Sequence, residues 1–178
     1  MLISKFGGSE IKKELERFED LIGTMLPEQL SAFLIKYNGG ETPNTKFSCN
    51  GISSDIRGFY GLGTVKDSYN KVSVIEDEYL PIAFDSFGNE IAISLNTGEV
   101  YFRDHEEGTN QLLEKDLKGF IECCKSDLIN PASKKSIQER EQDLIKNGRG
   151  NIITDALREM WQAEIDKYSS IIQEEVVF

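Results

Sequence analysis

The sequence predicts an α+β fold in which an antiparallel meander is flanked by helices and followed by a C-terminal helical extension. Apolar residues recur at helical spacing before residue 38, three strand-like segments joined by glycine-containing turns lie between residues 79 and 104, and helical patterns return after Pro131. A chain of 178 residues can bury one substantial core, whereas two domains cut from it would each be small. We therefore expect one α+β domain over residues 1–130 and a helical extension over residues 131–178, packed on that domain or on a partner chain.

The first two expected elements are helices. The first begins after Ser9, a candidate N-cap, ends near Gly23, and has an apolar stripe made of Ile11, Leu15, Phe18 and Ile22. A second is expected from Pro27, because proline suits the first turn of a helix, to the break at residues 38–40. Its apolar face consists of Leu30, Phe33, Leu34 and Tyr37. These helices should pack on each other and on the sheet.

Strands are expected in the middle of the chain. Residues 41–63 are rich in glycine, asparagine, serine and threonine, which favours loops and short strands. The segments 79–84, 90–95 and 99–104 are more clearly strand-like, and both connections between them contain glycine. Short connections of this kind predict antiparallel hairpins.

Three helices are expected after the meander. The first, beyond His105, would cover one face of the sheet with the stripe Leu113, Leu117, Phe120 and Cys124. Residues 133–146 and 152–174 predict two more, separated by the asparagine- and glycine-containing segment 147–151. The last has a wide apolar stripe that must be buried, either on its own domain or on another chain. The second alternative would be a homodimer formed through this helix.

The composition points to a cytoplasmic protein without membrane contact. No apolar stretch approaches the roughly 18 to 20 residues that a membrane span requires, and the N-terminus lacks the charged and apolar regions of a cleaved signal. The cysteines, Cys49, Cys123 and Cys124, are odd in number and two of them are adjacent. This arrangement argues against a disulfide framework and fits reduced thiols.

Negative charge is concentrated in one part of the sequence. The net charge is −11, and residues 67–107 contain ten acidic and two basic residues, a local charge of −8. Such a segment would repel a phosphate backbone, so we expect no nucleic-acid partner. It would attract a basic protein and accelerate their encounter. The plainer alternative is that the acids only solvate a surface and keep the protein soluble.

Catalytic and metal-binding motifs are weak. The only histidine, His105, could pair with a cysteine as base and nucleophile, but no local signature supports such a pair. Asp85 with Glu90, or Asp104 with Glu106, could form a carboxylate pair or a cation site, yet the ligand spacing of a calcium loop is absent and abundant carboxylates meet by chance. A structural zinc would need more ligands than this chain offers. We expect no cofactor, no metal and no catalytic residue.

The order of several short sequence pieces between Ile11 and Lys125 resembles the SUKH superfamily of immunity proteins, and within it the branch named for the yeast Smi and Knr regulators of cell-wall synthesis. The pieces are Leu26-Pro27-Glu28-Gln29-Leu30, Phe33-Leu34, Tyr37-Asn38-Gly39-Gly40, Phe59-Tyr60-Gly61-Leu62, Leu80-Pro81-Ile82-Ala83-Phe84-Asp85, Gly88-Asn89-Glu90-Ile91, and Gly98-Glu99-Val100-Tyr101-Phe102-Arg103-Asp104-His105-Glu106. Two features depart from the resemblance. The segment after Pro131 extends beyond it, and Tyr101-Phe102 stands where relatives often have a tryptophan.

The resemblance implies an antiparallel sheet flanked by helices and a role without catalysis. It implies that bacterial members neutralise a cognate toxin, often a nuclease, by binding it, and that fungal relatives are regulatory scaffolds of cell-wall synthesis. We expect acidic residues that attract a basic toxin domain and tyrosines that anchor it. The candidate partner-binding residues are Tyr60, Glu76, Asp77, Glu78, Tyr79, Asp85, Glu90, Tyr101, Asp104 and Glu106. For Tyr79 and Tyr101, packing within the sheet is an equal alternative.

Overall fold

The computed structural model describes residues 1–6, 10–63, 78–128, 135–169 and 172–178. The chain divides into two compact units, which we call the sheet unit (Met1–Leu128 with Gln173–Phe178) and the helical unit (Ile129–Ile172). The helical unit is therefore an insertion into the sheet unit, which resumes after it.

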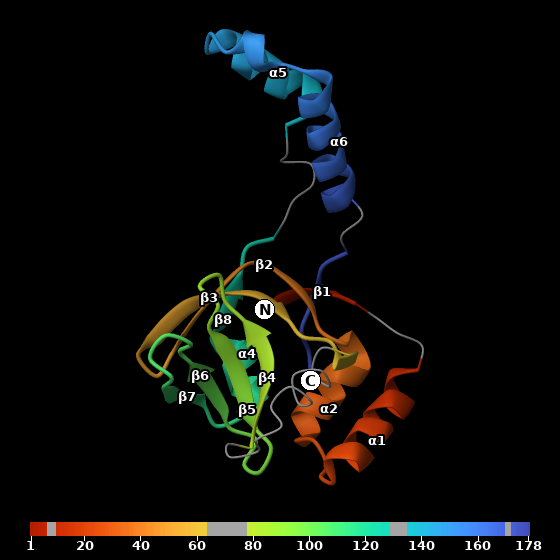
Figure 1. The fold of residues 1–178 in the computed structure, drawn as a ribbon, viewed down its shortest axis with the longest axis vertical. Coiled ribbons are helices and arrows are strands. Elements are labelled where there is room, and N and C mark those ends of the chain that lie inside the picture. The colour runs from red at the N-terminus through yellow and green to blue at the C-terminus, as the bar shows by residue number, and fades with distance from the viewer. Residues whose placement is uncertain (7–9, 64–77, 129–134, 170–171) are drawn as a thin grey trace. The chain divides into compact units, whose positions relative to one another are not determined.

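The sheet unit is built on one antiparallel sheet. Its strands are β1 (Leu2–Lys5), β2 (Gly40–Cys49), β3 (Ile52–Phe59), β4 (Tyr79–Phe84), β5 (Glu90–Ser94), β6 (Val100–Arg103), β7 (Asn110–Glu114), β8 (Cys124–Ser126) and β9 (Glu174–Glu175). Neighbouring strands follow the order β7-β6-β5-β4-β3-β2-β1-β9, and β8 pairs with β2. The antiparallel meander expected over β4, β5 and β6 is confirmed (Figure 1), and so is the α+β fold class.

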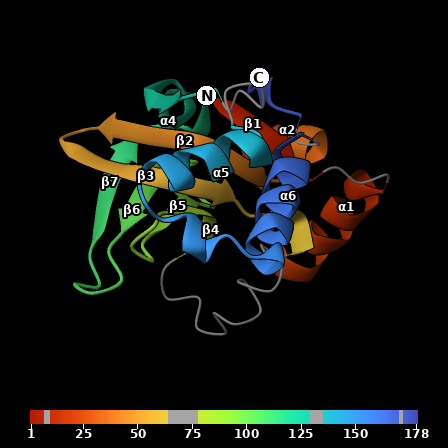
Figure 2. The same cartoon turned by 90° about the horizontal axis from the view of Figure 1, so that it is seen from above.

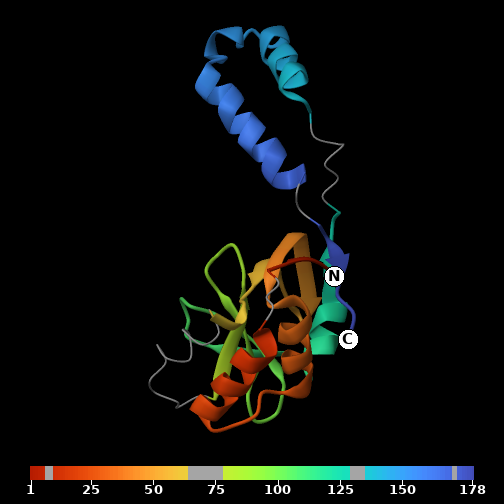
Figure 3. The ribbon, with the colours of Figure 1, turned by 90° about the vertical axis from the view of Figure 1, so that its right-hand side faces the viewer.

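Helices cover one face of this sheet, which we call the inner face. They are α1 (Ile11–Ile22), α2 (Glu28–Tyr37) and α4 (Leu117–Cys123). Phe33 of α2 packs on Phe59 with ring centroids 5.0 Å apart, and Phe120 of α4 packs on Phe47 at 5.4 Å. Figure 1 shows α4 behind β4 and β5, and Figure 3 shows the same arrangement from the side. Truncating any of these buried rings would cost about 3–5 kcal/mol.

The first two helices confirm the sequence pattern. The stripe expected in α1 is buried at Ile11, Leu15 and Phe18, although its proposed N-cap, Ser9, lies outside the described residues. Helix α2 follows Pro27 and ends at Asn38, whose left-handed backbone (φ 51°) turns the chain toward β2. The break expected at residues 38–40 is therefore present.

Two expectations for the sheet were wrong in detail. Residues 40–59 form the long β2–β3 hairpin (Figure 2), where loops and short strands were expected over residues 41–63. Strand β2 was hard to recognise because threonines occupy some of its buried positions. Thr42 can be buried there because its hydroxyl donates to the carbonyl of Ile56 at 2.7 Å. Residues 110–114 form β7 rather than the start of a helix. Helix α4 begins only after Asp116, whose carboxylate accepts from the N–H of Gly119 at 2.8 Å and caps it.

The last helix is also shorter than expected. Helix α6 (Asp155–Ser169) follows a 3-10 turn at Gly150–Ile152, and the chain then returns to the sheet unit as β9, which pairs with β1. Buried Tyr37 holds this return, because its hydroxyl oxygen accepts from the N–H of Val177 at 2.9 Å. Lys5 and Glu174 add an ion pair at 2.8 Å.

The helical unit consists of α5 (Ile137–Lys146) and α6. Helix α5 starts with a capping box in which Ser136 and Glu139 bond each other's backbone N–H groups. Ion pairs join α5 to α6, with Arg140 at 2.9 Å from Glu164 and Arg158 at 2.6 Å from Glu141. Among the described residues of either unit, no helix is both long and apolar enough to cross a membrane.

Candidate protein-binding surface

The sheet face opposite the helices carries four of the ten predicted partner-binding residues, namely Tyr60, Tyr79, Glu90 and Tyr101. Side chains alternate along β5, so that Ile91 and Ile93 are fully buried on the inner face while Glu90 is half-buried on the other. Cross-strand pairing places Phe84, Glu90 and Arg103 in one row across β4, β5 and β6. We call this surface the outer face and define it by Tyr60, Tyr79, Phe84, Glu90, Tyr101 and Arg103.

Two aromatic pairs dominate the outer face. Tyr60 stacks on Phe84 with ring centroids 5.2 Å apart, and Tyr79 meets Tyr101 edge to face at 4.8 Å. All four rings are half-buried. Rings that are fixed by each other yet reach solvent present contact area with little loss of side-chain freedom on binding.

The phenol groups of Tyr60 and Tyr101 have raised pKa values and stay neutral at ordinary pH. Tyr101 donates to the carboxylate of Glu99 at 2.8 Å, and this bond, followed by burial and by contact with Tyr79, raises the pKa of Tyr101 to about 12. Burial raises the pKa of Tyr60 too, and the charge of Glu90 adds to it. The negative charge of this surface therefore comes from its carboxylates alone.

Arg103 offsets part of that charge. Its guanidinium lies 3.8 Å from the carboxylate of Glu90, and its Nε donates to Asn110 at 3.2 Å. Opposite charges on facing residues of neighbouring strands stabilise their pairing modestly. The ion pair adds to the β5–β6 pairing at the end of the aromatic row.

A hollow of about 370 Å³ adjoins this ion pair. It is lined by Gly88, Glu90, Arg103, Asp104, His105, Gly108 and Asn110. The carboxylate of Asp104 accepts from the N–H groups of Glu106 and Glu107 at 2.8 and 2.9 Å, which lowers its pKa and keeps it ionised. Glu106 itself is exposed. The hollow is therefore lined by the Glu90–Arg103 ion pair and by the ionised carboxylate of Asp104.

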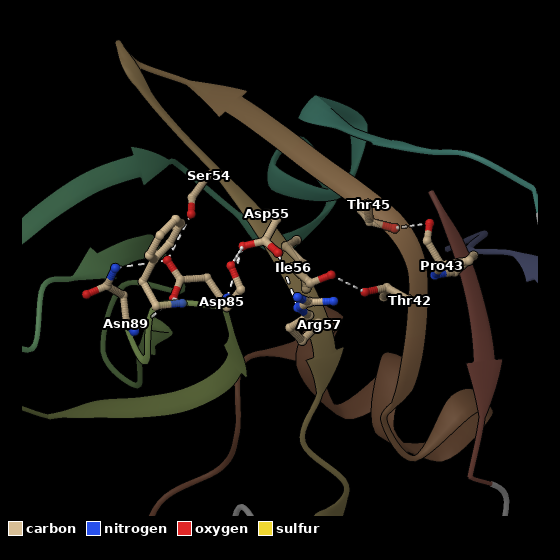
Figure 4. Close-up of polar contacts among 11 residues, drawn as sticks. Thr42, Pro43, Thr45, Ser54, Asp55, Ile56, Arg57, Asp85 and Asn89 are labelled. Atoms are coloured by element: carbon tan, nitrogen blue, oxygen red, sulfur yellow. Dashed lines mark hydrogen bonds and ion pairs between the residues drawn. The ribbon is translucent and has the colours of Figure 1, made fainter. Parts of the chain in front are cut away.

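Asp85 lies beneath the surface rather than on it. Its side chain is only 3% exposed and accepts from the Ser54 hydroxyl at 2.8 Å, from the N–H groups of Phe87 and Asn89 at 2.9 and 2.8 Å, and from the Asn89 amide at 2.9 Å. Figure 4 shows Ser54 and Asn89 on either side of it. A carboxylate with this many donors closes the β4–β5 turn and has little capacity left for a partner.

The other predicted acids are placed unequally. Glu78 is exposed immediately before β4, whereas Glu76 and Asp77 lie outside the described residues. Tyr60, Glu78, Tyr79, Glu90, Tyr101, Asp104 and Glu106 are thus described and reach solvent. Phe84, Glu99 and Arg103 share their surface but were not among the residues predicted from the sequence. The alternation of side chains along the strands could have identified these three residues. Glu99 and Arg103 each lie two residues from Tyr101, and Phe84 faces Glu90 across the β4–β5 hairpin.

The cysteines and His105 have separate environments. Cys49 and Cys124 are buried in the core, and burial raises the pKa of both thiols, that of Cys124 to about 12. His105 is exposed, with Nδ1 2.9 Å from the side-chain oxygen of Asn89. Across the described parts of the chain, no group of three or more His, Cys, Asp or Glu side chains is arranged to hold a metal ion.

The fold is thus that of a small α+β protein with helices on one face of an antiparallel sheet and a half-exposed aromatic surface on the other. Residues 12–123 match the model of the SMI1 / KNR4 family (SUKH-1), and the chain belongs to this family. The resemblance noted from the sequence is therefore confirmed. The helical unit lies outside the matched residues.

The chain is also similar to the SPbeta prophage-derived uncharacterized protein YokK of Bacillus subtilis (strain 168). The two are 29% identical over 119 residues, which cover 53% of this chain and 62% of the relative. The match spans less than two thirds of that protein's length.

Proposed function

We propose that this protein is a non-catalytic binding module that neutralises a cognate toxin in the cytoplasm by direct binding through the outer face. The toxin would be a basic protein, and the SUKH resemblance implies that it is often a nuclease. One observation carries the proposal, namely the two half-buried aromatic pairs that lie beside Glu90 and the ionised carboxylate of Asp104.

Charge and contact area would contribute to binding in different ways. The ten acids and two bases of residues 67–107 create a negative potential that accelerates the approach of a basic protein. The paired tyrosines then provide the apolar area on which affinity depends, because aromatic side chains in the centre of an interface contribute most of its binding energy. No step in such a role requires a nucleophile or a metal.

The prophage relative adds modest support. An immunity gene is useful only when it is inherited with its toxin gene, and mobile DNA transfers neighbouring genes together. A prophage-derived relative at 29% identity is consistent with that arrangement.

A second candidate is a regulatory scaffold of cell-envelope or cell-wall synthesis, which family membership favours because the yeast regulators give the family its name. The same outer face would then hold an enzyme or a signalling protein instead of a toxin. Gene context separates the two, since an immunity protein should be encoded beside a toxin.

The direct test is binding of the purified product of the neighbouring gene, measured by calorimetry and by inhibition of its toxicity. Toxin immunity predicts a stoichiometric complex and loss of toxicity. If that product neither binds nor is inhibited, the proposal fails for that partner, and binding to envelope-synthesis proteins instead would support the scaffold.

The role of charge is tested with a matched pair of double variants. Glu78→Lys with Glu106→Lys reverses two exposed acids near the outer face, and Glu16→Lys with Asp20→Lys reverses two exposed acids on α1. We expect only the first to slow association at low salt, by roughly tenfold, and to flatten the salt dependence. Equal effects from both would mean that net charge alone, rather than this surface, guides the partner.

A further inference from the structure

Two lysines face each other across neighbouring strands of the sheet. The register of β2 and β8 pairs Lys46 with Lys125, and both side chains are exposed. Residues directly opposite in an antiparallel pair lie on the same face with Cβ atoms about 4.5–5.5 Å apart, and like charges there destabilise the pairing. Phe47, the next residue of β2, packs on Phe120 of α4, so both lysines lie on the side of the sheet opposite the helices. We call Lys46 and Lys125 the lysine pair.

The acid nearest to the lysine pair in the sheet does not neutralise it. Asp55 of β3 faces Lys46 from the other side, but both of its carboxylate oxygens are engaged elsewhere. Its Oδ1 accepts from the N–H and the hydroxyl of Ser86 at 3.0 and 2.8 Å, and its Oδ2 lies 3.3 Å from Nε of Arg57 (Figure 4). Neither Lys46 nor Lys125 forms an ion pair or a side-chain hydrogen bond with any residue that the structure describes.

The charges around the lysine pair contrast with those of the whole protein. The chain has 31 acidic and 20 basic residues, yet Arg57, whose side chain is 63% exposed, adds a third cation next to Asp55. Asp127 follows β8 but forms no ion pair with Lys125 in the described part of the chain. Like charges held opposite each other without a counter-charge oppose strand pairing, and departures of this kind are expected at functional sites. The lysine pair is therefore a candidate binding point for an anion.

We propose that the lysine pair is a docking point for an acidic side chain or short acidic segment of the protein partner. The two ammonium groups project from neighbouring strands on one face, so one carboxylate can accept charge-assisted hydrogen bonds from both. Binding would also remove the repulsion between the lysines. A nucleic acid suits this position less well, because a protein with a net charge of −11 repels a phosphate backbone.

The inference rests on the proposed function for the identity of the protein that carries this acidic group. The outer face on β4 to β6 has carboxylates beside its aromatic pairs, whereas β2 and β8 present the lysine pair on the same side of the same sheet. A partner must then place cations over the first region and an anion over the second. Such an order of charges fixes the orientation of the partner and excludes proteins with a uniformly basic surface.

The first experiment uses the full chain and a short acidic peptide, tetraglutamate, followed by NMR at low salt. We expect saturable shifts of the backbone amide signals of Lys46 and Lys125. The double variant Lys46→Gln with Lys125→Gln should lose this response. Lys12→Gln with Lys13→Gln removes the same charge from exposed positions of α1 and should retain it. A wild type that shows no such shifts would overturn the proposal, and so would a response that the first double variant keeps.

The stability of the free protein gives a second measurement that needs no ligand. Removing the lysine pair should raise the urea midpoint at low salt, and added salt should reduce the gain, because the repulsion is screened. The α1 double variant should not gain stability, since it loses the ion pair of Lys13 with Glu10 and makes an acidic protein more negative. A midpoint that falls when the lysine pair is removed would mean that these lysines support the fold, which contradicts the proposal.

The toxin then separates this inference from the proposed function. We expect the lysine-pair double variant to bind the purified product of the neighbouring toxin gene roughly tenfold more weakly, and the α1 double variant to stay within about twofold of the wild type. A wild type that binds tetraglutamate at the lysine pair but binds no toxin would contradict only the proposed function. Toxin binding that is unchanged in the lysine-pair double variant would contradict only the docking point.

Discussion

The side-chain oxygen of Asn38 accepts a hydrogen bond from the backbone N–H of Leu62 at 2.8 Å, although 24 residues separate them. The contact joins the end of α2 to the segment that follows β3. A Cβ at Gly39 would lie 2.6 Å from the carbonyl oxygen of Phe59, so the two segments touch through bare backbone. The sequence pieces 37–40 and 59–62, separated along the chain, are therefore one structural feature.

Gly39→Ala should destabilise the protein more than Gly23→Ala. Both glycines have positive φ, +76° and +71°, which costs an alanine about 1–2 kcal/mol. Only Gly39 adds a steric clash, since nothing lies within 4 Å of a Cβ at Gly23. We expect a loss of about 3 kcal/mol or more for Gly39→Ala in urea unfolding, from the clash added to the backbone strain. Equal losses would contradict the close approach.

Asp85→Asn tests the turn between β4 and β5. In the asparagine side chain an NH2 group replaces one carboxylate oxygen, so a hydrogen-bond donor would face groups that now donate to Asp85. We therefore expect a loss of about 2–3 kcal/mol in the free energy of unfolding. Glu106→Gln removes the same charge from an exposed side chain and should change stability by less than about 0.5 kcal/mol. If the two variants unfold at the same urea concentration, Asp85 does not hold the turn.

Tyr101→Phe should change how stability depends on alkaline pH. Because the hydrogen bond to Glu99 and burial raise the pKa of Tyr101 from 10.0 to about 12, the folded protein retains the phenolic proton better than the unfolded chain. The resulting stabilisation is complete below about pH 10 and is lost as the pH rises toward about 12. Urea midpoints measured through this window should fall more steeply for the wild type than for Tyr101→Phe. Parallel curves would mean that the phenol is not held in this way.

Tyr79→Ala should weaken binding of the proposed toxin partner without unfolding the protein. Removing half of the Tyr79–Tyr101 pair deletes contact area at the centre of the outer face, for which we expect roughly a 30-fold loss of affinity. Leu21→Ala removes a 64% exposed apolar side chain from α1 and serves as the control. Unfolding curves identify any loss of structure. An affinity within about twofold of the wild type would place the interface elsewhere.

The meander and the first two helices could be predicted because their patterns were local. Glycine-containing turns and alternating residues marked β4 to β6, and Pro27 and Asn38 marked the limits of α2. The prediction of a helix over the β7 segment was wrong because Leu113, Leu117 and Phe120 share helical spacing by coincidence. The N-cap Asp116 was the signal that would have placed the start of α4 correctly.

Long-range pairing could not be predicted from local patterns. Strands β1 and β9 are short and pair only with segments far along the chain, so neither has a period to detect. Asp85 was misplaced for a related reason. An aspartate in a turn is usually exposed, and its burial follows from Ser54 on β3, whose position the sequence does not reveal.

The return of the chain to β1 sets an order of assembly during synthesis. The ribosome must complete the helical unit before it makes β9. One edge of β1 therefore stays uncovered until β9 has been synthesised. A nascent chain released before Gln173 would leave β1 open to pairing with other chains. Pairing of β9 therefore protects this edge of the sheet, and translation interrupted before β9 would yield a product prone to aggregate.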